Sequence, residues 1–310
     1  MITRYTFSEI IEISRDGEKP DWIDLSDPDE AELAEVGRQY SLPQWILTDP
    51  LDPKERPRAD QDGAAVLLVA RLSDRTTTPE GPVFRTVPVG IIIVPGLVVT
   101  VCRSPELVNV HLKRLFSRKR NWSCVRLAFA LFLASGTGFI ENIERMEELA
   151  GEAEAQLRRS PENEELLTLM TIEKALIDTT IALKSNHVLM EKFRQPDPFG
   201  LKLSKDERDI LDDSMIENQQ AIFMAEIFGQ VLASMSDAFG SIISNNLNKT
   251  MKFLAGVTIV LMLPTIIAGL YGMNVSLPGS EARGAFIILC ALCLVMMLMV
   301  SILFAKKKWF

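Results

Sequence analysis

The chain has 310 residues, enough for two ordinary domains, and a formal net charge of -8. Charged residues make up 24% of it, yet its mean hydropathy is slightly positive at +0.15. Both values fit one chain only if its apolar residues are concentrated in one part, and they are concentrated after Phe253. The basic residues form no long stripe, so nucleic acid is not an expected partner.

The segment 1–19 has no apolar core long enough for a signal peptide. It carries the acids Glu9, Glu12, Asp16 and Glu18. We therefore expect the large N-terminal part of the chain to remain in the cytoplasm. The four cysteines give no disulfide framework, and Cys290 and Cys293 are expected to be small apolar residues of a membrane helix.

Residues 1–120 predict an N-terminal α/β cytoplasmic domain. The short apolar runs 66–70 and 89–94 are bounded by turn residues, as buried strands are. The run 97–101 follows Pro95-Gly96, which predicts a hairpin with the strand before it. Helices are expected at 29–40 and 105–116.

Residues 121–203 predict a helical hairpin that is helical from Ser123 to about Arg194, with an apolar start at 125–134 and long segments at 139–158 and 166–193. One face of the first arm is apolar, formed by Phe139, Ile143, Met146 and Leu149. The same arm is strongly acidic, which indicates either an ordinary solvated face or a local field that attracts cations. Its acids are Glu141, Glu144, Glu147, Glu148, Glu152 and Glu154.

Residues 204–270 predict one long helix that continues into a membrane. Ser204 and Glu207 fit a capping box, and no helix-breaking residue follows until Pro264. At about 1.5 Å per residue, such a helix of about sixty residues would be about 90 Å long. A lone helix of this length is not stable, so its apolar face requires partners, which a bundle of identical helices would supply.

The C-terminal part predicts two membrane spans. Residues 253–270 contain no charge, and 285–305 contain one clearly polar side chain, Ser301. Each run is long enough to cross about 30 Å of hydrocarbon. The connecting outer loop 271–284 has one basic residue, whereas lysines precede the first span and form the basic tail 306–310. The positive-inside rule therefore puts both termini in the cytoplasm.

The first span carries small, polar and methionine side chains at helical spacing. Asn248, Met251, Thr258, Met262, Thr265 and Gly269 are separated by 3, 7, 4, 3 and 4 positions, which places them on one stripe of a helix. Such a stripe is unfavourable against lipid and can face a pore. It can equally form a packing interface between helices, since small and hydroxyl residues also favour that.

Several of these segments resemble a known family. Tyr271-Gly-Met-Asn274 stands at the outer end of the penultimate span, after Pro264-Thr265, and the second span ends in the basic residues 306–308. Together with residues 244–252, this arrangement resembles the CorA family of magnesium/cobalt transport proteins, two-span metal ion channels with a Gly-Met-Asn signature. The resemblance is close over residues 211–310. Over the first 200 residues only the order of elements is compatible.

The resemblance implies a funnel-shaped homopentamer in the plasma (inner) membrane. Each subunit would have an α+β cytoplasmic domain followed by a long helical stalk and two C-terminal transmembrane helices. The implied function is Mg²⁺ influx down the electrochemical gradient, with Co²⁺ and Ni²⁺ as further candidate ions. Met273 favours the magnesium branch over a related zinc branch. The alternatives are a transporter of zinc or another divalent ion from the same superfamily, and a two-span membrane sensor or scaffold without transport.

The resemblance also implies the residues of a pore. Gly272, Met273 and Asn274 would form the selectivity filter, in which a ring of Asn274 amides accepts hydrogen bonds from the waters around Mg²⁺. The stripe would then line the pore, through Asn248, Met251, Leu254, Thr258, Met262, Thr265 and Gly269. Of these, Met251, Leu254 and Met262 would form a hydrophobic constriction. Here Pro264 directly precedes Thr265, whereas some members have the proline one position earlier, and Glu281 is the only acid of the outer loop.

Three acids near the start of the long helix, Asp209, Asp212 and Asp213, resemble the regulatory region of the family. Asp209 and Asp213 lie one turn apart, so they could share a divalent ion with a neighbouring subunit, or form an ordinary acidic first turn favoured by the helix dipole. No cofactor is expected beyond Mg²⁺ as the transported and regulatory ion. An enzyme is not expected, because His111 and His187 are the only histidines and no nucleophile or phosphate-binding signature is present.

Overall fold

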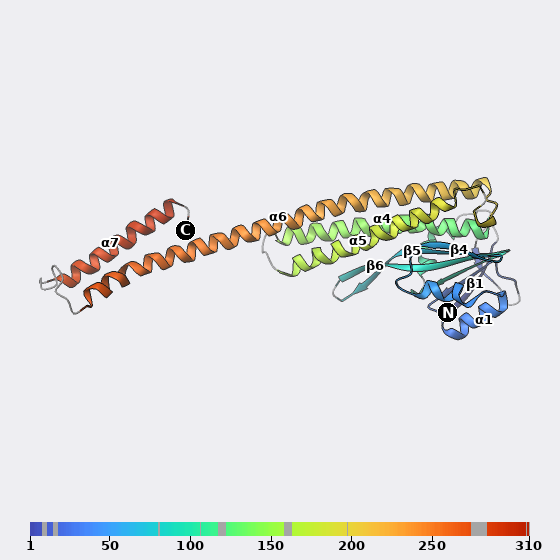
Figure 1. The fold of residues 1–310 in the computed structure, drawn as a ribbon, viewed down its shortest axis with the longest axis horizontal. Helices are drawn as coiled ribbons and strands as arrows, with labels where there is room; N and C mark the ends of the chain where they lie inside the picture. The colour runs from blue at the N-terminus through green and yellow to red at the C-terminus, as the bar shows by residue number, and fades with distance from the viewer. Residues whose placement is uncertain are drawn as a thin grey trace. The chain divides into compact units, whose positions relative to one another are not determined.

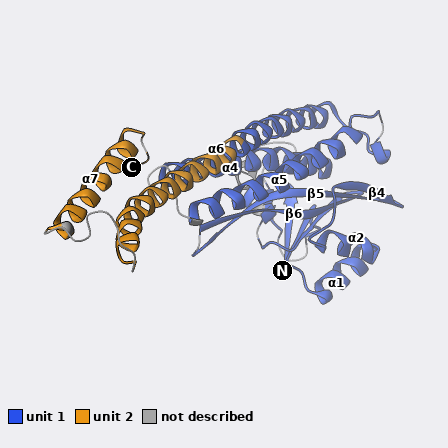
Figure 2. Ribbon diagram, turned by 60° about the vertical axis from the view of Figure 1, so that its left-hand side comes forward, with its two compact units in different colours: residues 1–233 blue, residues 234–310 orange. Residues whose placement is uncertain are grey.

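The computed structural model describes residues 1–7, 11–14, 18–79, 81–105, 107–116, 122–157, 163–196, 198–273, 284–307 and 309. Asn274 and Glu281 therefore lie outside the described residues. The chain divides into two compact units, which we call unit 1, Met1–Ala233, and unit 2, Ser234–Phe310 (Figure 2).

Unit 1 contains a seven-stranded sheet with the order β2-β1-β3-β7-β6-β5-β4 (Figure 1). Its neighbouring strands pair antiparallel, except for β3 and β7, which are parallel. The strands are β1 Ile2–Phe7, β2 Ile11–Ile13, β3 Trp22–Ser26, β4 Arg58–Asp62, β5 Ala65–Thr78, β6 Gly81–Val94 and β7 Leu97–Cys102.

The predicted strands 66–70, 89–94 and 97–101 lie at the start of β5, at the end of β6 and along most of β7. The hairpin at Pro95-Gly96 is confirmed by the pairing of Val94 with Leu97. The prediction was too short for β5 and β6. Both extend well beyond their apolar runs because they pair with each other as far as Thr78 and Gly81.

Both faces of the sheet are covered by helices, which explains the nearly continuous apolar runs of its central strands. Alternate residues of β5 enter different cores: Val66 and Leu68 belong to one cluster, Leu67 and Val69 to the other. The second cluster is closed by α1 Glu30–Tyr40 and α2 Gln44–Thr48, which is followed by the 3-10 turn η1 Asp49–Leu51. The first cluster is closed by α3 Leu107–Phe116, α4 Cys124–Leu157, α5 Asn163–Lys192 and the beginning of α6, with the 3-10 turn η2 Pro198–Gly200 between the last two helices.

The helices α4 and α5 pack side by side along the sheet, as the predicted hairpin requires (Figure 1). The expected helix start near Ser123 agrees with the structure, since α4 begins at Cys124 and runs without interruption through Ser135-Gly136, joining the apolar start to the segment that follows it. Of its predicted apolar face, Phe139, Ile143 and Met146 are buried and Leu149 is half-buried.

The long helix is α6, Lys205–Tyr271, with 67 residues, and it belongs to both units. The predicted capping box is present: the Ser204 amide donates to Glu207 Oε2 at 2.8 Å, and the Glu207 amide donates to Ser204 Oγ at 3.3 Å. Two buried polar side chains fix its first part within unit 1. Ser214 Oγ donates to the Phe129 carbonyl, and Asn218 Nδ2 donates to the Leu183 carbonyl, each at 3.0 Å.

Three helices among the described residues are long and apolar enough to cross a membrane: α4, α6 and the C-terminal helix α7, Ala285–Lys306. Half of the 18-residue apolar stretch of α4 is buried inside unit 1, whereas the corresponding stretches of α6 and α7 are 6% and 0% buried. The apolar segment of α4, including Leu127, Phe129 and Leu131, is therefore explained by its packing against the sheet.

Candidate functional site

The predicted pore stripe lies on the part of α6 that belongs to unit 2. The seven residues predicted to line the pore are exposed in the single chain: Asn248, Met251, Leu254, Thr258, Met262, Thr265 and Gly269. At about 100° per residue, they fall within about a third of the circumference of a continuous helix. Helical continuity is required for this, and α6 remains helical through Pro264.

The two threonines of the stripe use their hydroxyl protons within the helix. Thr258 Oγ1 donates to the Leu254 carbonyl at 2.8 Å, and Thr265 Oγ1 donates to the Leu261 carbonyl at 3.1 Å. A hydroxyl oxygen has two lone pairs besides its one proton. Both side chains therefore present acceptors, and no donor, toward the exposed side of α6.

The predicted filter begins where α6 ends. The Gly272 amide donates to the Ala268 carbonyl at 2.9 Å, and the Met273 amide donates to the Leu270 carbonyl at 3.3 Å. A Cβ atom on Gly272 would lie 3.1 Å from the Ala268 carbonyl oxygen, which is tighter than an ordinary contact. Glycine therefore allows the backbone to turn closely at this point. Asn274 itself lies outside the described residues.

The three predicted regulatory acids, Asp209, Asp212 and Asp213, are exposed on α6. Arg194 approaches Asp212 at 3.9 Å, a distance and exposure at which an ion pair contributes little. Within the described ranges, no group of three or more His, Cys, Asp or Glu side chains is arranged to hold a metal ion. Within one chain the acids thus face solvent, and the prediction that they share an ion with a neighbouring subunit stays a prediction.

The two histidines have structural contacts. The ring nitrogens of His111 face the Ser73 carbonyl at 2.8 Å and the Ala134 carbonyl at 3.3 Å, and His187 lies 3.8 Å from Glu191 on the next turn of α5. No pattern in the sequence indicates a carboxylate that joins two helix starts. Glu207 Oε1 accepts from Ser123 Oγ at 2.5 Å, and Ser123 Oγ in turn accepts from the Arg126 amide at the start of α4.

Comparison with known proteins decides the family. The family of CorA-like Mg²⁺ transporter proteins matches residues 17–307. The chain belongs to this family. The match extends through both units, so it confirms the resemblance inferred from the C-terminal motifs and adds the N-terminal part, where no motif was recognised.

Individual relatives cover nearly the whole chain. The cobalt/magnesium transport protein CorA of Methanocaldococcus jannaschii is 26% identical and covers 96% of this chain and 94% of its own length. The cobalt/magnesium transport protein CorA of Thermotoga maritima is 22% identical, with 95% and 85% covered. Both are transport proteins, which agrees with the expectation that this CorA-like chain is not an enzyme.

A solved structure has the same fold. The complete structure of the CorA magnesium transporter from Methanocaldococcus jannaschii matches with a TM-score of 0.83 at 23% identity, over 100% of this chain and 99% of that one. The CorA-like fold, an α/β domain combined with long helices, is therefore shown for the full chain.

Proposed function

We propose that this CorA-like protein is a channel for divalent cations, chiefly Mg²⁺, formed by five copies around the exposed stripe of α6. The observation that carries the proposal is the stripe itself, on a helix that ends at the Gly-Met-Asn sequence in a chain of the CorA-like family. The names of the relatives support the ion class, since both are cobalt/magnesium transport proteins.

The hydrogen bonds of the threonines support a cation over an anion. Mg²⁺ keeps several of its waters, whose protons point away from the ion. Thr258 and Thr265 spend their own protons on backbone carbonyls, so their free lone pairs can accept from such waters. Each water around an anion donates one proton to the ion and directs its lone pairs and its second proton outward, and the lone pairs would find no donor at these two positions.

The remaining parts of the proposal concern the filter and the regulation. A ring of Asn274 amides selects the hydrated ion, and Met251, Leu254 and Met262 form a constriction that stops ions by excluding water. Both termini are cytoplasmic, because lysines precede the first span and follow the second, and the positive-inside rule places such lysines on the cytoplasmic side. Internal Mg²⁺ closes the channel by bridging Asp209 and Asp213 to a neighbouring subunit.

The test is uptake into proteoliposomes, measured for Mg²⁺ with Co²⁺, Ni²⁺ and Zn²⁺ as competitors. Asn274→Ala should reduce Mg²⁺ uptake at least tenfold. Asn246→Ala is the matched control, since Asn246 is an exposed amide of α6 that lies about 200° from Asn248 around the helix. It should leave uptake within twofold of the unaltered protein.

Each other outcome selects an alternative. Uptake of Zn²⁺ in preference to Mg²⁺ would identify a zinc transporter of the same superfamily. Absence of uptake of all four ions by the unaltered protein would contradict the channel and favour a membrane sensor or scaffold. If Asn274→Ala leaves Mg²⁺ uptake unchanged, Asn274 is not part of the selectivity filter.

A further inference from the structure

The helix α5 has apolar side chains on two opposite faces. One face is buried inside unit 1 and includes Leu169, Ile172 and Leu176. The other face carries five large apolar side chains that are each more than half exposed, which we call the α5 ridge: Leu167, Met170, Ile177, Ile181 and Val188. At about 100° per residue, the five share about a quarter of the circumference. A helix that is apolar on both faces is normally covered on both.

The part of α6 in unit 1 has an exposed apolar ridge as well. This α6 ridge consists of Ile216, Phe223, Ile227 and Val231. Their separations of 7, 4 and 4 positions also confine them to about a quarter of the circumference. Separations of three, four and seven, which both ridges show, are those of helices that pack along one another in coiled coils.

The third long helix of unit 1 has no such ridge. Its exposed residues are acidic, small or amide-bearing: Glu144, Glu147, Glu148, Gly151, Glu152, Ala155 and Gln156. Exposed apolar surface is therefore concentrated on α5 and α6, and it is not a general property of this helical layer. Contiguous exposed apolar patches of this kind mark surfaces that bind another protein or a membrane.

Contacts within one chain fix the alignment of α5 and α6. Asn218 Nδ2 donates to the Leu183 carbonyl at 3.0 Å, and a Cβ atom on Gly229 would lie 3.7 Å from Leu176 Cδ2. The later residue of α6 thus lies beside the earlier residue of α5, so the two helices are antiparallel neighbours. These contacts define which residues of the two helices are at the same level.

The two ridges match level by level. Counted from the two contacts, three pairs of ridge residues lie at the same level to within about one helical turn: Ile177 and Ile227, Ile181 and Phe223, Val188 and Ile216. In a ring of copies whose axis runs along α6, rotation moves a residue around the axis and not along it. The α5 ridge of one copy and the α6 ridge of the next therefore keep the same levels, and apolar residues face apolar residues.

The charges on the two ridges are complementary. Lys174 and Lys192 are exposed on the same side of α5 as its ridge, and Asp209 and Asp213 are exposed on the same side of α6 as the other ridge. Two α5 ridges placed together would bring lysines to lysines. An α5 ridge against an α6 ridge combines opposite charges, which favours the second arrangement.

We propose that the α5 ridge of each copy packs against the α6 ridge of the next copy, so that unit 1 is joined head to tail around a ring. The occupant of each ridge is thus a second copy of this chain. This inference rests on the proposed assembly of five copies around α6. It adds a contact surface on unit 1, separate from the pore stripe on unit 2.

The test is oxidative disulfide cross-linking of the full chain in liposomes, read by electrophoresis without reductant. The background carries Cys290→Ala and Cys293→Ala, which removes the two cysteines of α7. In this background, Ile181→Cys combined with Phe223→Cys should give a ladder of bands up to the pentamer. Each substitution alone should give only monomer, and coexpression of the two single variants should give dimers. A disulfide within one chain leaves the monomer band and is not counted.

A second pair and a control accompany this experiment. Ile177→Cys with Ile227→Cys tests the next level of the two ridges and should give the same ladder, so the test does not depend on the folding of one variant. Ile181→Cys with Glu147→Cys is the matched control, because Glu147 is an exposed residue of α4. It should give only monomer.

Two results would overturn the proposal alone. One is a cross-linked dimer from Ile181→Cys by itself, which would show that two α5 ridges face each other. The other is the absence of a ladder from both pairs while light scattering still finds a pentamer. An unaltered protein that is monomeric in light scattering would instead contradict the proposed channel together with this contact, so the two failures are distinguishable.

Discussion

Substitution of Glu207 tests how the start of α6 is fixed to unit 1. This side chain is 9% exposed and closes the capping box with Ser204, while its other oxygen accepts from Ser123 at the start of α4. One carboxylate thus serves two helix starts. Glu207→Gln keeps the shape but replaces one acceptor oxygen by an N–H₂ group, which faces hydroxyl donors.

The magnitude follows from the bonds that are lost. A capping bond contributes about 0.5–2 kcal/mol, and bonds to a charged acceptor contribute about 1.5–3 kcal/mol each. Because the glutamine oxygen keeps part of this network, we expect a loss of about 1–3 kcal/mol. For a unit of this size, about 2–4 °C in melting temperature corresponds to each kcal/mol, so the midpoint should fall by roughly 2–12 °C.

The effect should depend on pH with a defined sign. Burial by itself raises the pKa of Glu207, but the hydrogen bonds from Ser123 and Ser204 and the charge of Arg126 outweigh it, and the pKa is lowered from 4.5. A lowered pKa means that the carboxylate stabilises the fold above pH 4.5, and that this contribution is lost as the pH falls through the lower, folded-state pKa. The difference between Glu207→Gln and the unaltered protein should therefore be constant near neutral pH and shrink below pH 4.5.

The measurement is thermal melting of the detergent-solubilised full chain from pH 7.5 to pH 4, with Glu147→Gln as the control for an exposed glutamate of α4. A melting midpoint for Glu207→Gln within 1 °C of the control at pH 7.5 would show that the hydrogen bonds of Glu207 do not stabilise the fold. So would a difference that grows toward acidic pH, since that would require a raised pKa.

Two further substitutions in unit 1 are informative. Burial raises the pKa of Asp24, and the hydrogen bond from Thr100 offsets this only in part, so the ionised carboxylate destabilises the fold as the pH rises. The melting midpoint of Asp24→Asn should therefore match or exceed that of the unaltered protein at pH 8, and the difference between the two midpoints should narrow as the pH falls. Gly138→Ala forces a Cβ atom against His111 and should lower the melting midpoint by the equivalent of about 1–3 kcal/mol. A Cβ atom at Gly151, on the same helix, would have no neighbouring atom within 4 Å, so Gly151→Ala should raise the midpoint slightly. Equal shifts in both variants would contradict the steric argument.

The elements that could be predicted from the sequence are those whose signal is local. The start of α6 has a capping box, its continuity follows from the absence of breakers before Pro264, and the turn between β6 and β7 has Pro95-Gly96. By contrast, β4 reads Arg-Ala-Asp-Gln-Asp over 58–62 and has no apolar alternation. It is a strand because β5 offers it a paired edge from Ala65 to Val69, which no local pattern reveals.

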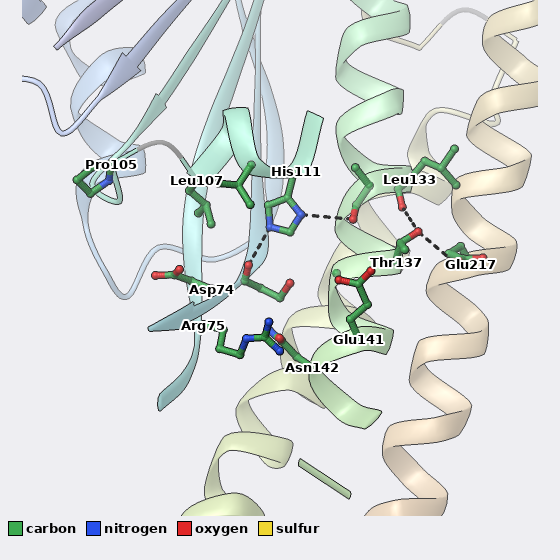
Figure 3. Close-up of a pocket in the computed structure, with 14 residues that line it drawn as sticks. Asp74, Arg75, Pro105, Leu107, His111, Leu133, Thr137, Glu141, Asn142 and Glu217 are labelled. Atoms are coloured by element: carbon green, nitrogen blue, oxygen red, sulfur yellow. Dashed lines mark hydrogen bonds between the residues drawn. The ribbon is translucent and has the colours of Figure 1, made fainter. Parts of the chain in front are cut away.

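The candidate sites also differ in whether a local pattern in the sequence reveals them. The stripe of α6 could be found because a helix converts fixed spacing into a shared face. A cavity of about 560 Å³ in unit 1 could not be found in this way, because its lining residues Asp74, Asn142 and Glu217 are far apart in the chain and meet only after the sheet and three helices have packed (Figure 3). Asn142 in particular gives no signal in the sequence, since an asparagine among the glutamates of α4 is unremarkable until its burial is known.

The family resemblance answers two questions together: whether the stripe of α6 lines a pore, and which ion passes through that pore. The threonines of the stripe show that these questions are separate. Thr258 and Thr265 bond to their own helix, which lowers the cost of facing lipid or another helix, so they do not by themselves require a pore. In the proposed pore they favour cations over anions, because they offer acceptors alone. They cannot distinguish Mg²⁺ from Co²⁺ or Ni²⁺, whose hydration shells present the same outward protons. A choice among these ions requires a ring of fixed diameter, and only several copies of the chain can form one. In the proposal this task falls to Asn274, whose amide has both donors and an acceptor, rather than to the threonines.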